Sequence, residues 1–183
     1  GMRSHYTLPV INPGSTSTRI SYFVDEDERH SQTLSHSADE LSEYESIAEQ
    51  APLRRAAIDS FLAEHGISVD ELSAVIGRGG LLHPLEGGVY EVTDSMIADL
   101  DSARYGSHAS NLGGVLAKAI ADSVGCPAYI ADPVVVDELD DVARLSGVPQ
   151  LPRRSIFHAL NQKSAAREAC TRRGIEYERA NLI

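Results

Sequence analysis

The stretch from Val10 to Arg19, Val-Ile-Asn-Pro-Gly-Ser-Thr-Ser-Thr-Arg, decides how the first part of the chain folds. The apolar run Leu8–Ile11 predicts a strand, and Arg19–Val24 predicts a second strand. An Asn-Pro-Gly turn and four hydroxyl residues lie around the connection. Backbone N–H groups and hydroxyls gathered in a tight turn can surround the oxygens of a phosphate, so a phosphorylated ligand is one hypothesis. The turn lacks the Gly-Lys-Ser/Thr of a Walker A loop, and a plain hairpin explains the same residues equally well.

Composition and charge limit the kinds of partner that this protein is expected to bind. The chain has 183 residues, of which 42% are hydrophobic, and this is enough for one ordinary core. Its 16 basic and 27 acidic residues give a formal net charge of −11. Such a surface repels nucleic acids and anionic lipids, so neither is expected as a partner.

The chain shows no pattern of a membrane or exported protein. No apolar run approaches the ~20 residues of a membrane span. No signal-peptide pattern precedes the first strand, so we expect a cytoplasmic protein. The two cysteines, Cys126 and Cys170, have no metal-ligand neighbours in the sequence and are expected to be free thiols.

Helical and extended patterns alternate along the rest of the chain. Ser37 and Glu40 have the spacing of a capping box, and apolar residues at helical spacing continue from there to Ala48. Pro52 predicts the start of a second helix and Gly66 its end. Further strands are expected over 30–34, 72–77, 89–92 and 128–131, and further helices from Thr93 or Asp94 to Leu100, from about Ala109 to Val124 and from Ser155 to about Arg172. This order predicts an α/β fold with a mixed sheet and helices on both faces.

Five motifs then occur in one order along the chain. They are Val-Ile-Asn-Pro-Gly-Ser-Thr-Ser-Thr from Val10, Gly-Arg-Gly-Gly-Leu-Leu from Gly77, Gly-Ser-His-Ala-Ser-Asn-Leu-Gly from Gly106, Ala-Asp-Pro-Val-Val-Val-Asp-Glu-Leu from Ala131 and Arg-Arg-Ser-Ile-Phe-His-Ala-Leu-Asn-Gln-Lys from Arg153. In this order and at this spacing they resemble the butyrate kinases, in the acetate and butyrate kinase branch of the sugar kinase and actin superfamily. The resemblance covers essentially the whole chain.

The resemblance implies a ribonuclease H-like, actin-like ATPase domain. Enzymes of this family are longer and have two similar α/β domains with a cleft between them. We therefore expect an N-terminal domain over 2–145 and the truncated start of a second domain over 146–183, with the boundary in the Gly- and Pro-flanked segment Leu145–Pro149. A chain cut at this point is expected to lack activity alone. It is also expected to form homo-oligomers, because the cut leaves apolar surface exposed.

The resemblance also implies an activity and its site residues. The activity is transfer of the γ-phosphoryl of ATP, with Mg²⁺, to butyrate or a related short-chain acid, so the expected ligands are a nucleotide and a small carboxylate. Arg78 would contact the carboxylate or the transferred phosphoryl, Asp132 would position the acceptor or the metal, and His158 would lie near the phosphoryl. Asn12 would lie close to Mg²⁺ and the phosphates, and the donors for phosphate oxygens would come from Gly14, Ser15, Thr16 and Ser17. His108 and Asn111 would line the cleft.

Each of these residues also has a purely structural explanation. Asn12 suits a turn before proline, Asp132 an Asp-Pro turn, and His158 a buried position on an apolar helix. Arg78 without the family match is a loop arginine between glycines, and His108 and Asn111 suit the cap and first turn of the following helix.

Two other functions compete with the kinase interpretation. A truncated or degenerate relative can serve as a non-catalytic interaction or oligomerisation domain. A relative of the sugar or glycerol kinases is the weaker alternative, because the Asp-Pro-Val-Val-Val-Asp motif from Asp132 to Asp137 argues against it.

Overall fold

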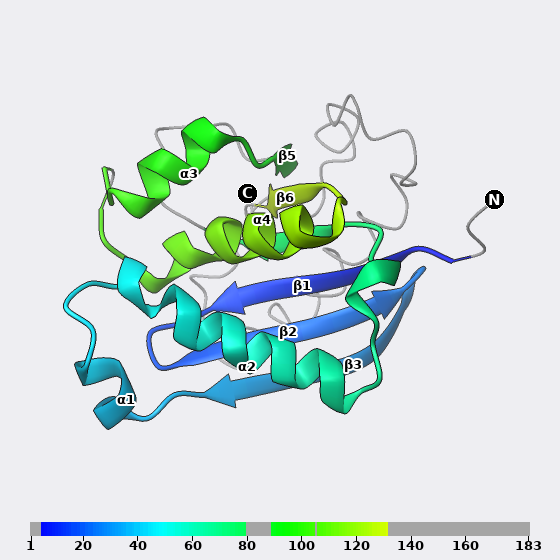
Figure 1. Ribbon diagram of the computed structural model, residues 1–183, viewed down its shortest axis with the longest axis horizontal. Coiled ribbons are helices and arrows are strands. Elements are labelled where there is room, and N and C mark those ends of the chain that lie inside the picture. The colour runs from blue at the N-terminus through cyan, green and yellow to red at the C-terminus, as the bar shows by residue number, and fades with distance from the viewer. Residues whose placement is uncertain (1–4, 80–88, 105, 132–183) are drawn as a thin grey trace, which may run out of the picture.

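The computed structural model describes residues 5–79, 89–104 and 106–131, and one six-stranded sheet lies at its centre (Figure 1). The strands lie in the order β3-β2-β1-β4-β6-β5. Their bounds are β1 Thr7–Pro13, β2 Ser17–Val24, β3 Asp27–Ser35, β4 Val75–Arg78, β5 Val89–Glu91 and β6 Ala128–Ala131. All six overlap with stretches that the sequence predicts to be extended.

The sheet combines two kinds of strand pairing. β1, β2 and β3 form an antiparallel meander, whereas β1, β4 and β6 run parallel to one another and β5 is antiparallel to β6. An antiparallel meander continued by parallel strands is the ribonuclease H-like arrangement, and the expected α/β fold class with a mixed sheet is confirmed. The parallel strands bring their carboxyl ends to one edge of the sheet, where α/β proteins bind ligands.

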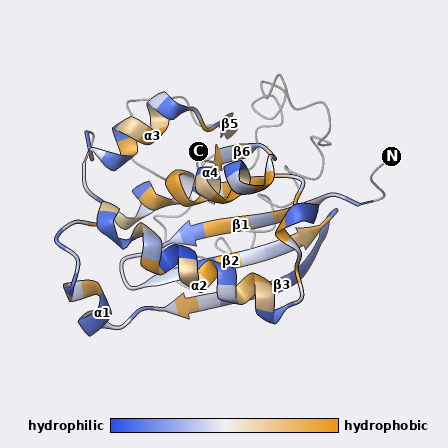
Figure 2. Cartoon of the chain, viewed as in Figure 1, coloured by the Kyte–Doolittle hydropathy of each residue, from blue (hydrophilic) through white to orange (hydrophobic). Residues whose placement is uncertain are grey.

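Helices pack on one face of the sheet, here called the helix face (Figure 1). Its apolar core joins residues such as Ile11 and Ile20 of the strands to Ile58 of α2 and Leu116 of α4. In Figure 2, hydrophobic and polar residues alternate along α2, as expected for a helix that buries one side only. The helices are α1 Ala38–Ser42, α2 Ala51–Glu64, α3 Asp94–Asp101 and α4 Leu112–Val124, with 3₁₀ turns η1 Ala48–Gln50, η2 Val69–Glu71 and η3 Ala109–Asn111.

Two glycines let α4 touch the sheet backbone to backbone. A Cβ on Gly77 would lie 2.1 Å from the carbonyl oxygen of Gly113, and a Cβ on Gly113 would lie 2.6 Å from the carbonyl oxygen of Arg78. Neither position therefore has room for a side chain. This contact places the start of α4 against the carboxyl end of β4.

The opposite face of the sheet, here called the second face, has its own buried apolar cluster. Leu8 and Val10 of β1, Ile76 of β4 and Tyr129 of β6 belong to it. Burial raises the pKa of the Tyr129 hydroxyl. Of the described helices, α2, α3 and α4 pack on the helix face, and the helix expected over 155–172 lies outside the described residues, as does the expected boundary at 145–149.

The helix that the sequence predicts after Ser37 is shorter in the structure. Its capping box is confirmed, because the Glu40 N–H donates to Ser37 Oγ (3.1 Å) and the Ser37 N–H donates to Glu40 Oε1 (3.1 Å). The helix ends at Ser42, although apolar residues continue at helical spacing to Ala48. None of its residues is buried, and so short a helix depends on packing for its stability. None of the described helices has the length and hydrophobicity to cross a bilayer.

Candidate functional site

Two of the predicted site residues lie side by side at the carboxyl ends of parallel strands. Asn12 is in β1 and Arg78 is the last residue of β4, and the residues just before them, Ile11 and Gly77, pair across the two strands. The residues two positions before them belong to the second-face cluster, so strand alternation puts both side chains on that face. Asn12 is half-buried, and Arg78 is only 1% exposed.

Arg19 of β2 extends this pair into a row across the sheet. It is the cross-strand partner of Asn12 on the other side from Arg78. Its Nη1 donates to Thr33 Oγ1 (3.1 Å) and its Nη2 donates to Ser31 Oγ (2.7 Å), so two hydroxyls of β3 fix the guanidinium. An amide between two arginines can bind an oxyanion such as a carboxylate or a phosphoryl group.

β6 ends next to this row. Ala131, its last residue, pairs with Arg78, and the Gly79 N–H donates to the Ala131 carbonyl oxygen (3.0 Å). Asp132 follows Ala131 directly in the sequence. Asp132 itself and His158 lie outside the described residues, so their roles stay predictions.

The turn between β1 and β2, residues 14–16, lies at the same edge of the sheet, directly after the carboxyl end of β1. The Gly14 N–H donates to the Ser17 carbonyl oxygen (2.7 Å), and the Thr16 carbonyl oxygen accepts from the His36 N–H (2.8 Å). Ser15 and Thr16 are exposed, and their backbone N–H groups have no acceptor in the part of the chain that the structure describes. The tip of this turn therefore presents free hydrogen-bond donors.

Arg54 of α2 lies fully buried behind the turn. Its Nη1 donates to the Ser17 carbonyl oxygen (2.8 Å) and Thr18 Oγ1 (3.3 Å). Its Nη2 donates to the Ser15 carbonyl oxygen (3.3 Å) and Gln50 Oε1 (3.0 Å), and its Nε donates to the same Gln50 oxygen (3.2 Å). All five N–H donors of the guanidinium thus reach neutral acceptors. Burial lowers the pKa of Arg54, yet an arginine side chain keeps its charge.

His36 joins this network just after β3. Thr18 Oγ1 and His36 Nε2 are 2.8 Å apart and both side chains are buried. Because the Thr18 oxygen accepts from Arg54, we assign its hydrogen to His36 Nε2, which then belongs to a neutral imidazole. Burial lowers the pKa of His36, the charge of Arg54 lowers it further, and Glu40 acts in the opposite direction.

His108 and Asn111 make local hydrogen bonds before α4. His108 is the N-cap of η3, where its Nδ1 accepts from the Ser110 N–H (3.3 Å). Asn111 Nδ2 donates to the Gly106 carbonyl oxygen (2.8 Å). The capping explanation therefore holds for His108. Asn111 is buried and lines a pocket of about 160 Å³ together with residues of η1, α3 and Leu112, and a role of either residue in a cleft stays a prediction.

The described residues contain no ready-made metal centre. Among residues 5–79, 89–104 and 106–131, no three His, Cys, Asp or Glu side chains are grouped closely enough to hold an ion. Asn12 as a group near Mg²⁺ stays a prediction. The half-buried Cys126 packs against the helix-face core and forms no disulfide within the described residues, and Cys170 lies outside them.

The sequence does not predict the buried network of Arg54 or the place of Arg19 beside Asn12. One signal for Arg54 was available, because it lies four residues before Ile58 and so continues the apolar side of the predicted helix. A cation at such a position needs acceptors inside the fold. For Arg19 only the cross-strand register shows that it lies beside Asn12.

Together, a ribonuclease H-like sheet and polar, cationic groups at the carboxyl ends of its parallel strands define an α/β protein with a polar, cationic sheet edge. No family model matches the chain. Over 97% of its length, the chain is 52% identical to the probable butyrate kinase of Clostridium botulinum and to butyrate kinase 1 of Clostridium acetobutylicum. It is 51% identical to the probable butyrate kinase of Coprothermobacter proteolyticus. The chain is therefore a homologue of the butyrate kinases, which confirms the resemblance of the five motifs.

The chain spans about half the length of the curated relatives it matches, since the aligned segment makes up 50% of each. Among solved structures, it is similar to an acetate kinase of Porphyromonas gingivalis, with a TM-score of 0.44, 14% identity and coverage of 72% of this chain and 38% of that one. It is also similar to RuvC of Thermus thermophilus, with a TM-score of 0.43, 14% identity and coverage of 89% and 96%. Scores this low carry no argument about function.

Proposed function

We propose that the chain is one half of a carboxylate kinase that transfers the γ-phosphoryl of ATP to butyrate or a related short-chain acid. One observation carries the proposal: Asn12 lies between Arg19 and Arg78 at the same sheet edge as a turn with free N–H donors. The identity of about half of all positions with butyrate kinases supports the choice of a carboxylate as the acceptor.

Phosphoryl transfer between oxygens needs charge neutralisation and alignment more than covalent chemistry by the protein. The N–H groups and hydroxyls of Ser15 and Thr16 bind phosphate oxygens at the turn. The buried guanidinium of Arg78 binds the acceptor carboxylate or the phosphoryl group in transfer, because its planar fork fits two oxygens at once. Asn12 orients the same group through its amide, and Arg19 adds a second positive charge.

Mg²⁺ fits this site only together with phosphates. The described donors are amides, hydroxyls and arginines, whereas Mg²⁺ prefers carboxylate, phosphate and water oxygens. We therefore expect the ion to arrive with ATP, with Asn12 on its outer shell. When bound, Mg²⁺ neutralises charge on the phosphates. Asp132, directly after the strand paired with Arg78, and His158 are the further groups proposed for this centre.

A pair of assays tests the proposal. The chain alone, given ATP, Mg²⁺ and butyrate in a coupled assay for ADP, should show no turnover, because half of the length of its relatives is missing. A chimera that joins this chain to the unmatched half of the Clostridium botulinum relative should phosphorylate butyrate. In that chimera Arg78→Met should lower kcat/KM at least about a hundredfold, whereas Arg55→Met on the outside of α2 should leave it unchanged.

Two results would contradict the proposal. Normal turnover by the chain alone would show that it is not half of a site. A folded chimera without turnover on any short-chain acid would favour the alternative, a non-catalytic interaction domain.

A further inference from the structure

Arg54 is a buried cation whose charge has no obvious purpose in the fold. It is 0% exposed, and every acceptor around it is neutral. Within the described residues, no carboxylate forms an ion pair with it, and burial alone accounts for the lowering of its pKa. A desolvated charge without an opposite charge is costly, and groups of this kind are concentrated at functional sites.

The peptide group between Ser15 and Thr16 lies between the buried Arg54 guanidinium and the solvent-facing side of the turn. Arg54 Nη2 donates to the Ser15 carbonyl oxygen from inside the fold (3.3 Å). In a trans peptide the C=O and the following N–H point in opposite directions, so this bond turns the Thr16 N–H away from Arg54 and toward solvent. That N–H is one of the two free donors of the turn.

The same peptide group can transmit the polarising effect of the Arg54 charge to the Thr16 N–H. Hydrogen bonds in a chain polarise one another, so a cation at the carbonyl oxygen strengthens the N–H as a donor. A second bond, from Arg54 Nη1 to the Ser17 carbonyl oxygen (2.8 Å), fixes the other side of the turn. The turn is thus held by a cation on its inner side and presents its donors on its outer side.

We propose that Arg54 is the positioning residue of a phosphate-binding turn and supplies the positive charge that a bound phosphate group faces. The proposal rests on the proposed function, since it assumes that the turn binds phosphate. It adds that the affinity of the turn depends on a residue that never touches the ligand. The bound anion supplies the negative charge that no carboxylate of the described residues provides for Arg54.

The test is a titration of the 183-residue chain with inorganic pyrophosphate at low ionic strength, followed by the backbone amide resonances of the folded protein. Arg54→Met should weaken binding at least about tenfold. Arg54→Lys keeps the charge but cannot reach both carbonyl oxygens, so it should weaken binding by a smaller factor. The matched control is Arg55→Met, which removes the same charge from the exposed pair with Asp59 and should change the dissociation constant less than twofold.

A structural role alone predicts a different pattern. Loss of stability leaves the dissociation constant of the folded molecules unchanged, because the titration follows their resonances only. The amide proton of Thr16 gives a second signature: without ligand it should move upfield in Arg54→Met, as its donor strength falls, and stay in place in Arg55→Met.

Each outcome decides between the two claims. No binding of pyrophosphate to the unaltered chain would overturn the phosphate site and this inference together. Equal affinity of the unaltered chain and Arg54→Met would overturn the inference alone. Where Arg54→Met does not fold, Arg54→Lys decides, and an affinity equal to that of the unaltered chain would overturn the positioning role.

Discussion

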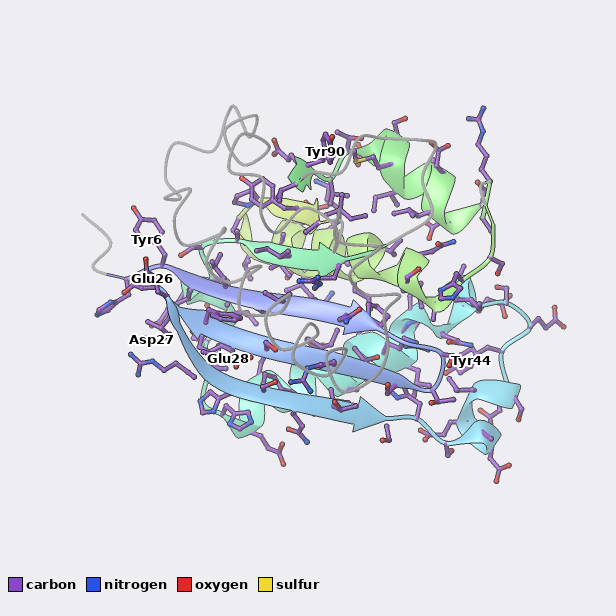
Figure 3. All side chains as sticks on the ribbon, turned by 180° about the vertical axis from the view of Figure 1, so that it is seen from behind. Tyr6, Glu26, Asp27, Glu28, Tyr44 and Tyr90 are labelled. Carbon is purple, nitrogen blue, oxygen red and sulfur yellow. The ribbon has the colours of Figure 1, made fainter. Side chains whose placement is uncertain are left out.

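The two turns of the β1-β2-β3 meander have opposite chemistry. The first, residues 14–16, carries no acidic side chain and has its carbonyl oxygens held from inside by Arg54 and His36. The second, Asp25 and Glu26, is acidic, and the Asp25 carboxylate accepts from the Tyr6 N–H (2.9 Å) and lies 2.7 Å from His5. Figure 3 shows Glu26, Asp27 and Glu28 together at one end of the sheet, away from the end marked by Tyr44 toward which β1 points.

The difference supports the proposal that the first turn binds an anion, whereas the second turn only reverses the chain. At the second turn, the protein uses the Asp25 carboxylate to hold the backbone N–H of Tyr6. At the first turn, it fixes the carbonyl oxygens of Ser15 and Thr16 and leaves the N–H groups of the same two residues without an acceptor among the described residues. Free N–H groups of this kind are what an anion site requires. In a chain with a net charge of −11, an acidic turn far from the proposed phosphate site also limits repulsion of an anionic ligand.

The largest expected effect on stability comes from Arg54→Met. It leaves the Ser15 and Ser17 carbonyl oxygens without their donor, which should lower the free energy of unfolding by about 2–4 kcal/mol. Arg55→Met, next to it on α2, removes only a surface pair with Asp59 and should cost under about 1 kcal/mol. Urea denaturation of both variants measures this, and equal losses would mean that Arg54 does not hold the turn.

A smaller loss is expected from Thr18→Val. The fully buried hydroxyl links Arg54 to His36, and valine removes both hydrogen bonds at nearly constant volume. The free energy of unfolding should fall by about 1–3 kcal/mol. Thr33→Val on exposed β3 is the control and should cost under about 1 kcal/mol; a larger loss there than at Thr18 would contradict the buried network.

The pH dependence of stability should report His36. Its pKa is lowered in the fold by burial and by Arg54, with Glu40 opposing, so below its ordinary value of 6.5 the unfolded chain takes up a proton first. The stability contribution is complete above that value, and it is lost as pH falls toward the lowered pKa. His36→Asn should flatten this part of the profile. An unchanged slope in His36→Asn would rule out the assigned neutral ring.

The smallest effect is expected at the second turn. The Tyr6 N–H first, and then His5, hold the pKa of Asp25 below its ordinary value, so its contribution to stability is lost as pH falls through that lowered pKa. The side chain is 40% exposed, and Asp25→Asn at pH 7 should therefore cost under about 1 kcal/mol. Asparagine tolerates the positive φ of 53° at this position. Urea denaturation measures this loss of unfolding free energy. A loss larger than that of Thr18→Val would mean that the second turn contributes more to stability than the network behind the first.

Local signals in the sequence predict much of this fold. The apolar run Leu8–Ile11, the Ser37–Glu40 capping box, and Gly66 and Gly125, both at positive φ after their helices, mark elements that short-range chemistry determines. The order of the strands depends instead on long-range packing, such as the backbone contact of Gly77 with α4. Asn12 and Arg78 could be placed at strand ends from the sequence, but only the register shows that they are neighbours.

Arg54 marks the limit of sequence reasoning here. Its position on an apolar helix side gives a hint, but its acceptors are backbone oxygens some 40 residues earlier in the chain. The residue types of the first turn do not indicate which of its carbonyl oxygens point toward α2 in the folded chain.

The most direct test of the central claim is a pyrophosphate titration of the chain with the amide resonances of both turns observed at once. If the first turn binds phosphate, the Ser15 and Thr16 amide protons should show saturable downfield shifts, with no saturable shift at Glu26 or Asp27. This titration is run at physiological salt, where the screening length is ~8 Å. Strand geometry, with about 3.3 Å per residue, puts the second turn roughly 25 Å away, so the bound anion is screened from it. Equal shifts at both turns, or no shift at Ser15 and Thr16, would contradict a phosphate site at the first turn.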